Sequence, residues 1–282
     1  MHIPQRTVLL IGGTSETSRL AESLAEAGLG VLVSLAGNTP LDVGTHPRIR
    51  KRVGPLDEAL MEGLVNDRHV SCIVDAAHPY ASQVHLTSRT VAVRLGLPYF
   101  RWVREESVIE DAPLIRFADD HEDAATLAAS MGHSVLLTTG SRNLIPYARE
   151  CARAGISLAA RVLPDEDSVM ACSIASIPQE KIITGRGPFS LDENLAAIRQ
   201  YGIDVLVTKD GGPAGGVPEK LKAAEISGCK VVVIRRPVLP SDNEYGDIGT
   251  LVGEVCRASI GPGNGIEGDG GCAKVEEKGS FI

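Results

Sequence analysis

Short apolar, β-branched runs alternate with helical patterns along most of this chain, in two successive series. Such alternation is typical of a mostly parallel sheet with helices on its faces. The strands predicted in the first series are Val8–Ile11, Gly30–Leu35, Cys72–Asp75 and Tyr99–Val103. The helices predicted between them lie around Glu16–Ala27, Leu56–Asp67 and Ala81–Leu95.

A second series begins near Ser134. Its predicted strands are Val135–Thr139, Ser157–Ala160, Lys181–Thr184, Val205–Lys209 and Lys230–Ile234, and its predicted helices are Asn143–Ala154, Leu191–Tyr201 and Pro218–Ser227. The sequence therefore predicts an α/β fold of two Rossmann-like domains with mostly parallel sheets and a cleft between them. We expect domains at residues 1–130 and 131–260, with Glu105–Met131 bridging them. Residues 261–282 are rich in glycine and are expected to form a flexible tail.

Length and charge narrow the classes of function. The 282 residues suffice for two modest domains, and a net charge of -8 argues against a general nucleic-acid or membrane-surface binder. Six scattered cysteines without a C-x-x-C pair suit a reducing compartment. Since the N-terminus has no apolar signal region and no apolar run spans a bilayer, we expect a cytoplasmic protein.

The clearest candidate for ligand binding is the turn after the first predicted strand. Val8–Ile11 runs into Gly12 and Gly13, and Thr14, Ser15 and Glu16 lead into a helix. A buried strand that ends in glycines at a helix N-terminus favours an anion such as the phosphate of a nucleotide. The third glycine of G-x-G-x-x-G is absent, so a plain tight turn that binds nothing stays open.

Further candidate residues follow other predicted strands. Asp75, His78 and Tyr80 combine an acid, an imidazole and a phenol on one loop, although Asp75 as a helix cap and His78 as a turn residue is the alternative. Lys209 ends a buried strand before a glycine-rich loop, where its ammonium can stabilise developing negative charge; alternatively, its stem only covers the strand ends.

Two more loops are candidate anion sites. The first contains Thr139, Gly140 and Ser141, and the second contains Gly185, Arg186 and Gly187. Hydroxyls, glycines and an arginine suit phosphate or carboxylate, whereas ordinary loops are the alternative. The basic run at residues 46–52 is interpreted as a solvated face. We expect no metal site, because no cluster has metal-ligand spacing.

Taken together, these loops resemble the precorrin-6A reductase family of the cobalamin pathway, including its cobalt-precorrin-6A members. The matching segments, in family order over about the first 240 residues, are Gly12–Glu16, Asp75–Tyr80, Gly96–Tyr99, Leu137–Gly140, Gly185–Phe189, Val207–Lys209 and Arg236–Pro237. The resemblance implies reduction of one double bond in a polycarboxylated tetrapyrrole by NADPH, between two Rossmann-like domains.

The resemblance assigns roles to the candidate residues. Lys209 would steady charge or relay the proton, and Asp75, His78 and Tyr80 would orient the macrocycle or donate a proton. The loops at residues 12–16, 139–141 and 185–187 would hold pyrophosphate and ribose, in an order that the sequence leaves open. Arginines would meet the substrate carboxylates.

Three positions depart from the family pattern. Asn38 stands where an arginine would suit a 2′-phosphate, so NADH remains an alternative cofactor. The segment Arg52–Asp57 lacks the usual glycines, and Asp210 replaces an asparagine beside Lys209. A non-redox tetrapyrrole enzyme and a non-catalytic nucleotide sensor are the alternative functions. The sequence decides neither the metal content of the substrate nor the oligomeric state.

Overall fold

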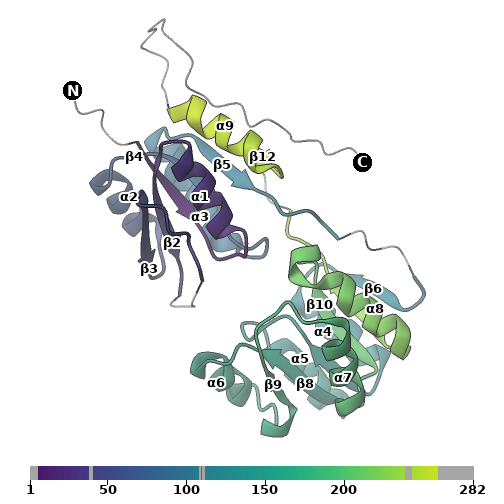
Figure 1. Ribbon diagram of the computed structural model, residues 1–282. Helices are drawn as coiled ribbons and strands as arrows, with labels where there is room; N and C mark the ends of the chain where they lie inside the picture. Colours follow the sequence, from purple (N-terminus) through teal and green to yellow (C-terminus); the bar gives the residue numbers. More distant parts are fainter. Residues whose placement is uncertain (1–5, 38–40, 108, 110–111, 239–242, 260–282) are drawn as a thin grey trace, which may run out of the picture.

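The computed structural model describes residues 6–37, 41–107, 109, 112–238 and 243–259. They form two lobes, each built on a parallel six-stranded sheet (Figure 1). The first lobe has the strand order β12-β5-β4-β1-β2-β3. Its strands are β1 (Thr7–Ile11), β2 (Gly30–Leu35), β3 (Ile49–Val53), β4 (Val70–Asp75), β5 (Tyr99–Trp102) and β12 (Glu244–Tyr245).

The second lobe has the order β6-β11-β10-β7-β8-β9. Its strands are β6 (Ile115–Ala118), β7 (Ser134–Leu137), β8 (Ser157–Val162), β9 (Ile182–Thr184), β10 (Val205–Lys209) and β11 (Lys230–Ile234). Read from β3, the first sheet follows the doubly wound order 3-2-1-4-5-6. The second sheet has the same arrangement from β9 to β11, but its sixth position holds β6, which precedes the other five strands in the chain. The two Rossmann-like sheets predicted from the sequence are thus confirmed.

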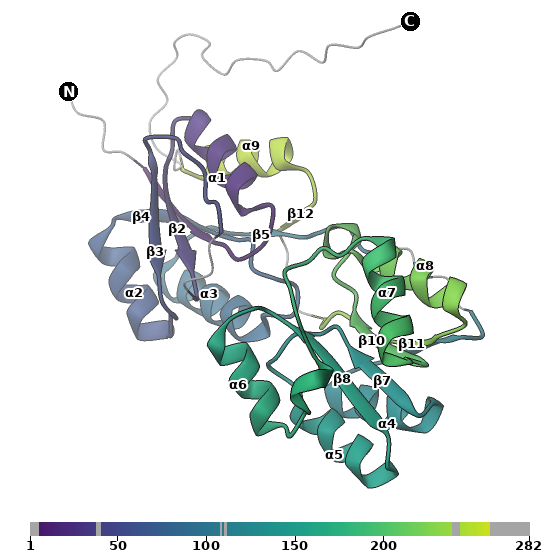
Figure 2. The same cartoon turned by 60° about the horizontal axis from the view of Figure 1, so that its bottom comes forward.

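Helices cover both faces of each sheet (Figure 2). In the first lobe α1 (Thr17–Glu26) and α9 (Ile248–Ser259) pack on one face, and α2 (Glu58–Asp67) and α3 (Ser82–Leu95) on the other. In the second lobe one face carries α4 (His121–Met131), α5 (Ile145–Ala154) and α6 (Glu166–Ile174), and the other carries α7 (Leu191–Tyr201) and α8 (Val217–Ser227).

This layering explains the apolar strands of the sequence. In β1, Val8 and Leu10 face the core under α1 and α9, whereas Leu9 and Ile11 face the core under α2 and α3. Because both faces of the sheet are covered, successive side chains of a central strand are all buried. Gly96 ends α3 with φ 66°, a left-handed conformation that favours glycine and that stops the helix before β5.

The chain crosses between the lobes twice, at different places from the predicted domain limits. The segment Glu105–Met131 was expected to bridge the domains, but its β6 pairs with β11 and its α4 packs on the second sheet. After the second lobe is complete, β12 pairs with β5 and α9 covers the first sheet. The lobes therefore do not divide at residue 130 or end at residue 260, because the second lobe already begins with β6 and the first lobe receives β12 and α9 from beyond the second crossing.

Other sequence expectations are partly covered by the described residues. The basic run contains the edge strand β3, in which Ile49 is buried while Arg50 and Lys51 are exposed. None of the described cysteines forms a disulfide, and four of them are buried. In the part of the chain that the structure describes, every helix is too short or too polar to cross a membrane. The predicted tail at residues 261–282 and Asn38 lie outside the described residues.

Candidate active site

The predicted site loops gather where each sheet reverses its winding. In the first lobe β1 and β4 are neighbours, so Gly12–Glu16 and Asp75–Tyr80 leave the same point of the sheet edge. In the second lobe β7 and β10 are neighbours, which brings together Thr138–Arg142 and Lys209–Gly216. The carboxyl ends of the strands at such a crossover point form the usual ligand crevice of doubly wound folds.

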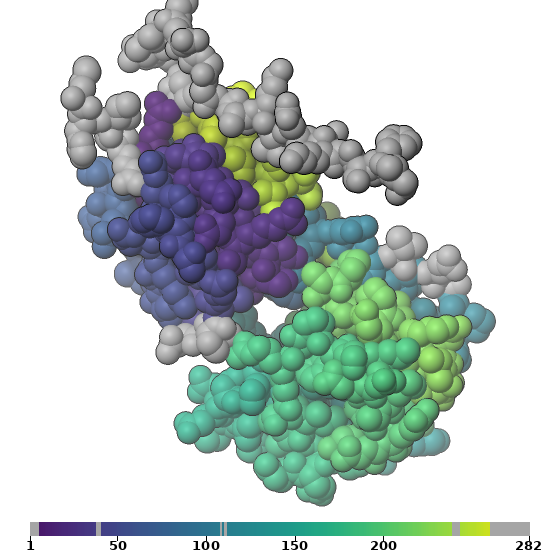
Figure 3. Space-filling model, in the orientation of Figure 1, coloured from purple at the N-terminus to yellow at the C-terminus, as the bar shows by residue number. Residues whose placement is uncertain are grey.

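Tyr80 joins the two crossover points. Its hydroxyl donates to the carbonyl of Ile234 at 2.5 Å and accepts the N–H of Asp210 at 2.8 Å. Since Tyr80 follows β4 while Asp210 and Ile234 lie at the ends of β10 and β11, the carboxyl edges of the two sheets face each other. An opening remains between the lobes in the space-filling view (Figure 3). This is the cleft that the sequence predicted.

Lys209 lies at this junction, with its Nζ 5.1 Å from the centre of the Tyr80 ring. The side chain is half-buried, and burial together with the charge of Arg142 lowers its pKa to about 8. Among the described residues no acceptor takes a hydrogen bond from Nζ. Lys209 therefore has a mobile proton near neutral pH and no fixed partner for it.

His78 is a neutral neighbour of this lysine. Its ring centre is 5.7 Å from that of Tyr80, and its Nδ1 accepts the Tyr80 N–H at 3.3 Å. Burial, followed by the charges of Arg104, Lys209 and Arg236, lowers the pKa of His78 to about 4. With Nδ1 accepting, the remaining proton of the neutral ring is on Nε2. His78 is suited to donate a hydrogen bond rather than a proton at pH 7.

Tyr80 and Asp75 are both committed to structural contacts. Burial raises the pKa of Tyr80, and its hydroxyl is used by the two backbone bonds across the lobes. Asp75 is fully buried, and its carboxylate accepts from the Ala77 N–H at 3.1 Å and the Tyr99 hydroxyl at 2.7 Å and pairs with His85 at 2.7 Å. Of the four predicted catalytic residues, Lys209 and His78 retain groups that are free to act on a ligand.

The glycine turn after β1 is open on one side. At Gly13, with φ 128°, an added Cβ would meet nothing within 4 Å, whereas at Gly12 it would lie 2.6 Å from Thr17. The hydroxyl of Thr17 accepts the N–H groups of Gly13 and Thr14 at 3.1 and 3.2 Å. Two amides at the helix N-terminus are thus already used, so Ser15 and Glu16 present the next polar groups to a ligand.

Arg104 connects this turn to the second lobe. Its guanidinium donates to the Ser15 hydroxyl at 2.9 Å, to the Glu16 carboxylate, and to the Gly211 carbonyl at 3.5 Å. Although burial alone would raise it, the pKa of Glu16 is lowered by the hydrogen bond and charge of Arg104. Because Arg104 is only 8% exposed, this ion pair is shielded from solvent.

Arg236 links the two segments that cross between the lobes through hydrogen bonds. It donates to the carbonyls of Arg104 at 2.7 Å, Glu105 at 2.8 Å and Asp210 at 3.0 Å. Of these two arginines, the sequence indicated Arg236 only as part of the family pattern. Their contacts join segments 88–132 residues apart, which spacing along the chain does not reveal.

The remaining candidate loops differ in position. Thr139, Gly140 and Ser141 follow β7 at the crossover of the second lobe, next to Arg142, and the Ser141 hydroxyl lies 3.2 Å from that of Ser168. Gly185, Arg186 and Gly187 follow the edge strand β9 instead. There Phe189 covers the Arg161 guanidinium at 4.2 Å and packs against Gly185. The continuation of this third loop reaches the Lys209–Gly216 loop, since a Cβ added at Gly216 would lie 3.2 Å from Pro188.

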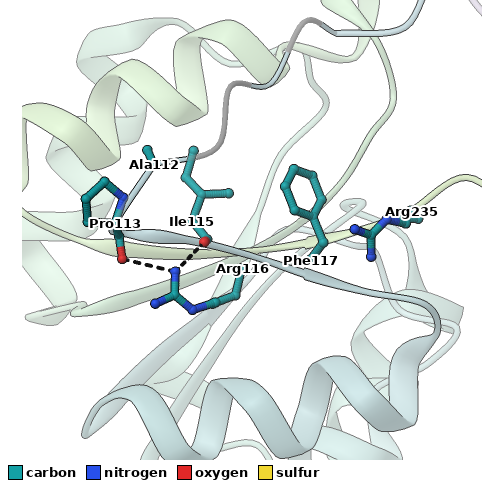
Figure 4. Close-up of a pocket in the computed structure, with 6 residues that line it drawn as sticks. All are labelled: Ala112, Pro113, Ile115, Arg116, Phe117 and Arg235. Atoms are coloured by element: carbon teal, nitrogen blue, oxygen red, sulfur yellow. Dashed lines mark hydrogen bonds between the residues drawn. The ribbon is translucent and has the colours of Figure 1, made fainter.

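A shallow hollow of about 440 Å³ lies away from these loops, along the edge strand β6 (Figure 4). Phe117 and Arg235 line it with Arg116, which donates to the carbonyls of Pro113 and Ile115. The chemistry-bearing residues of the crossover points are absent from its lining, so we do not assign the activity to it.

Comparisons with known proteins agree with this arrangement. Residues 7–255 match the family described as "Precorrin-6x reductase CbiJ/CobK". The cobalt-precorrin-6A reductase of Priestia megaterium is 30% identical over 90% of this chain and 98% of its own length. The precorrin-6A reductase of Rhodococcus erythropolis is 33% identical over 85% and 93%.

A solved structure of a CobK precorrin-6A reductase superposes with a TM-score of 0.74 at 23% identity, over 90% of this chain and 97% of the other. That likeness supports the fold, and the sequence matches carry the assignment. The chain belongs to the precorrin-6x reductase family.

Proposed function

We propose that this chain reduces one double bond in the macrocycle of precorrin-6A or of its cobalt form, as a step of cobalamin synthesis, with NADPH as the reductant. Family membership supports the reaction class of an oxidoreductase acting on a CH–CH group. The observation that carries the proposal is the meeting of two crossover points at Tyr80, with the unpartnered Lys209 beside them.

The first crossover point is the proposed cofactor site. A Cβ added at Gly13 would meet nothing within 4 Å, so the backbone there is accessible. Ser15 lies just before α1, and the N-terminus of a helix favours phosphate. From the second lobe, the loop Thr139–Ser141 and Arg142 are proposed to contact the bound cofactor and substrate on the opposite side. When bound, the reduced nicotinamide supplies the hydride. NADH stays an alternative, since Asn38 offers no cation for a 2′-phosphate.

The second crossover point is proposed to bind the macrocycle and to supply the proton that the macrocycle takes up. Lys209 holds a proton at Nζ with a pKa close to the working pH, as an efficient general acid requires. His78 donates a hydrogen bond from Nε2 and orients the macrocycle. Exposed arginines at the cleft, including Arg142 and Arg186, are proposed to bind peripheral carboxylates, which the net charge of -8 would otherwise repel.

Anaerobic incubation with precorrin-6A and NADPH tests the proposal. We expect loss of nicotinamide absorbance together with a product two hydrogens heavier, and parallel reactions with cobalt-precorrin-6A and NADH resolve substrate and cofactor preference. NADPH binding without turnover of either substrate would favour the sensor. No dinucleotide binding at all would favour a non-redox enzyme.

Arg104→Ala is expected to weaken NADPH binding about tenfold, or about 1.4 kcal/mol. The substitution leaves the Glu16 carboxylate without its partner next to the proposed phosphate site, where like charges repel. Calorimetric titration of NADPH measures the change. Adding Glu16→Gln to Arg104→Ala removes the repelling charge and should restore most of the affinity, whereas unchanged affinity in the single variant would exclude a cofactor phosphate at this turn.

A further inference from the structure

A buried histidine, His85, holds the loop that carries His78 and Tyr80. His85 lies in the first turn of α3 and is 4% exposed. Its Nδ1 is 2.7 Å from Asp75 Oδ2, and its Nε2 is 3.0 Å from the backbone carbonyl of His78. One imidazole thus connects the end of β4 to the turn that follows it.

The hydrogen-bond donors and acceptors around His85 indicate which of its ring nitrogens carry a proton. A carbonyl oxygen only accepts, so Nε2 of His85 must carry a proton to bond His78. Asp75 Oδ2 also accepts the Tyr99 hydroxyl, and Asp75 Oδ1 accepts the Ala77 N–H. These two donors stabilise the Asp75 carboxylate in its ionised form. An ionised Oδ2 only accepts, so the His85 Nδ1 that lies 2.7 Å away would donate to it, and both ring nitrogens would then carry hydrogen.

The surroundings are compatible with a buried ion pair. His85 and Asp75 are 4% and 0% exposed and together carry no net charge. The other titratable groups that face the pair are the His78 ring, which is neutral, and the Tyr99 phenol, whose pKa is raised by burial and by Asp75. Arg101 and Arg89 act on that phenol from β5 and α3. A fully bonded pair of this kind is rigid, since each partner has its hydrogen bonds satisfied.

We infer that His85 is a positioning residue: as an imidazolium held by Asp75, it fixes the His78 carbonyl and so places His78 and Tyr80 in the cleft. This role is not visible in the sequence pattern, because His85 is one of several polar residues that α3 buries, together with Thr87 and Ser88. The kinetic part of the inference rests on the proposed reduction. The protonation part does not.

Nitrogen NMR of the histidine rings in the full chain tests the protonation directly. At pH 7 we expect the two ring nitrogens of His85 to show protonated shifts, while His78 shows one protonated and one bare nitrogen. The His85→Gln variant assigns the signals. A bare Nδ1 or Nε2 in His85 at pH 7 would overturn the inference, whatever substrate the enzyme uses.

Kinetics test the positioning. His85→Phe removes both donors while keeping a ring of similar size, and we expect kcat to fall between about tenfold and 100-fold, as misplaced reacting groups do, while NADPH affinity stays unchanged. The His78 signals should shift in the same variant. Leu86→Ala, at a 59% exposed position of the same helix, is the matched control. Wild-type kcat in a folded His85→Phe protein would refute the role, and His85→Gln replaces it if that protein does not fold.

Discussion

Replacing Lys209 by glutamine is expected to lower kcat by a factor of about 10²–10⁴, the usual contribution of a positioned acid. Glutamine keeps the length and polarity of the side chain but cannot transfer a proton. The proposed dinucleotide site lies on the other lobe, so the affinity for NADPH should change little. Steady-state kinetics and NADPH titration of the same preparation separate the two effects.

The wild-type pH profile should carry the signature of this lysine. An acid acts in its protonated form, and the pKa of Lys209 is lowered to about 8 by burial and by Arg142. Turnover should therefore be constant well below pH 8 and decline as the pH rises through that value. Lys209→Gln should lack this decline. Lys222→Gln, at an exposed position of α8, serves as the control, and a full kcat in Lys209→Gln would remove the lysine from the mechanism.

Asp75→Ala is expected to lower the unfolding free energy of the first lobe by about 3–5 kcal/mol. The variant leaves the charged ring of His85 buried without its partner and removes the acceptor of the Tyr99 hydroxyl and the Ala77 N–H. Trp102 is the only tryptophan of the chain and lies in β5 of that lobe. Its fluorescence in urea therefore reports the relevant transition.

Two further variants test whether the loss of stability comes from the buried ion pair. Asp67→Ala, at an exposed position of α2, should leave the Trp102 transition within about 0.5 kcal/mol of wild type. Combining Asp75→Ala with His85→Ala removes the stranded charge and should recover part of the loss. If Asp75→Ala alone were as stable as Asp67→Ala, the buried pair would not be ionised as the hydrogen bonds indicate.

Central strands were predictable from the sequence, whereas among the edge strands of the described residues only β9 was. The limits of β2, β10, β11 and α7 agree with the predicted ones, because covered strands are continuous apolar runs and α7 lies between a serine cap and a glycine. Strands β6 and β12 have four and two residues at sheet edges. Their pairing comes from the neighbouring strand rather than from a pattern of their own.

The site was predictable in its parts but not in its connections. Lys209 and Tyr80 could be selected because each follows an apolar strand, where doubly wound folds place their ligands. The hydrogen bond between Tyr80 and Ile234 joins residues 154 positions apart. Which of the candidate groups remain free therefore depends on contacts that only the folded chain brings together, such as those that occupy Asp75.

The return of β12 and α9 to the first lobe has a practical consequence for anyone who divides this protein. A fragment that stops at residue 130 would include β6 and α4 without a sheet to join, and would lack β12 and α9. Because Leu251 and Val255 of α9 belong to the core under α1, that core would be exposed to water in the fragment. Expression of halves divided at residue 130 should thus yield insoluble material. In the intact protein two segments cross between the lobes, so any movement of one lobe against the other must bend both segments.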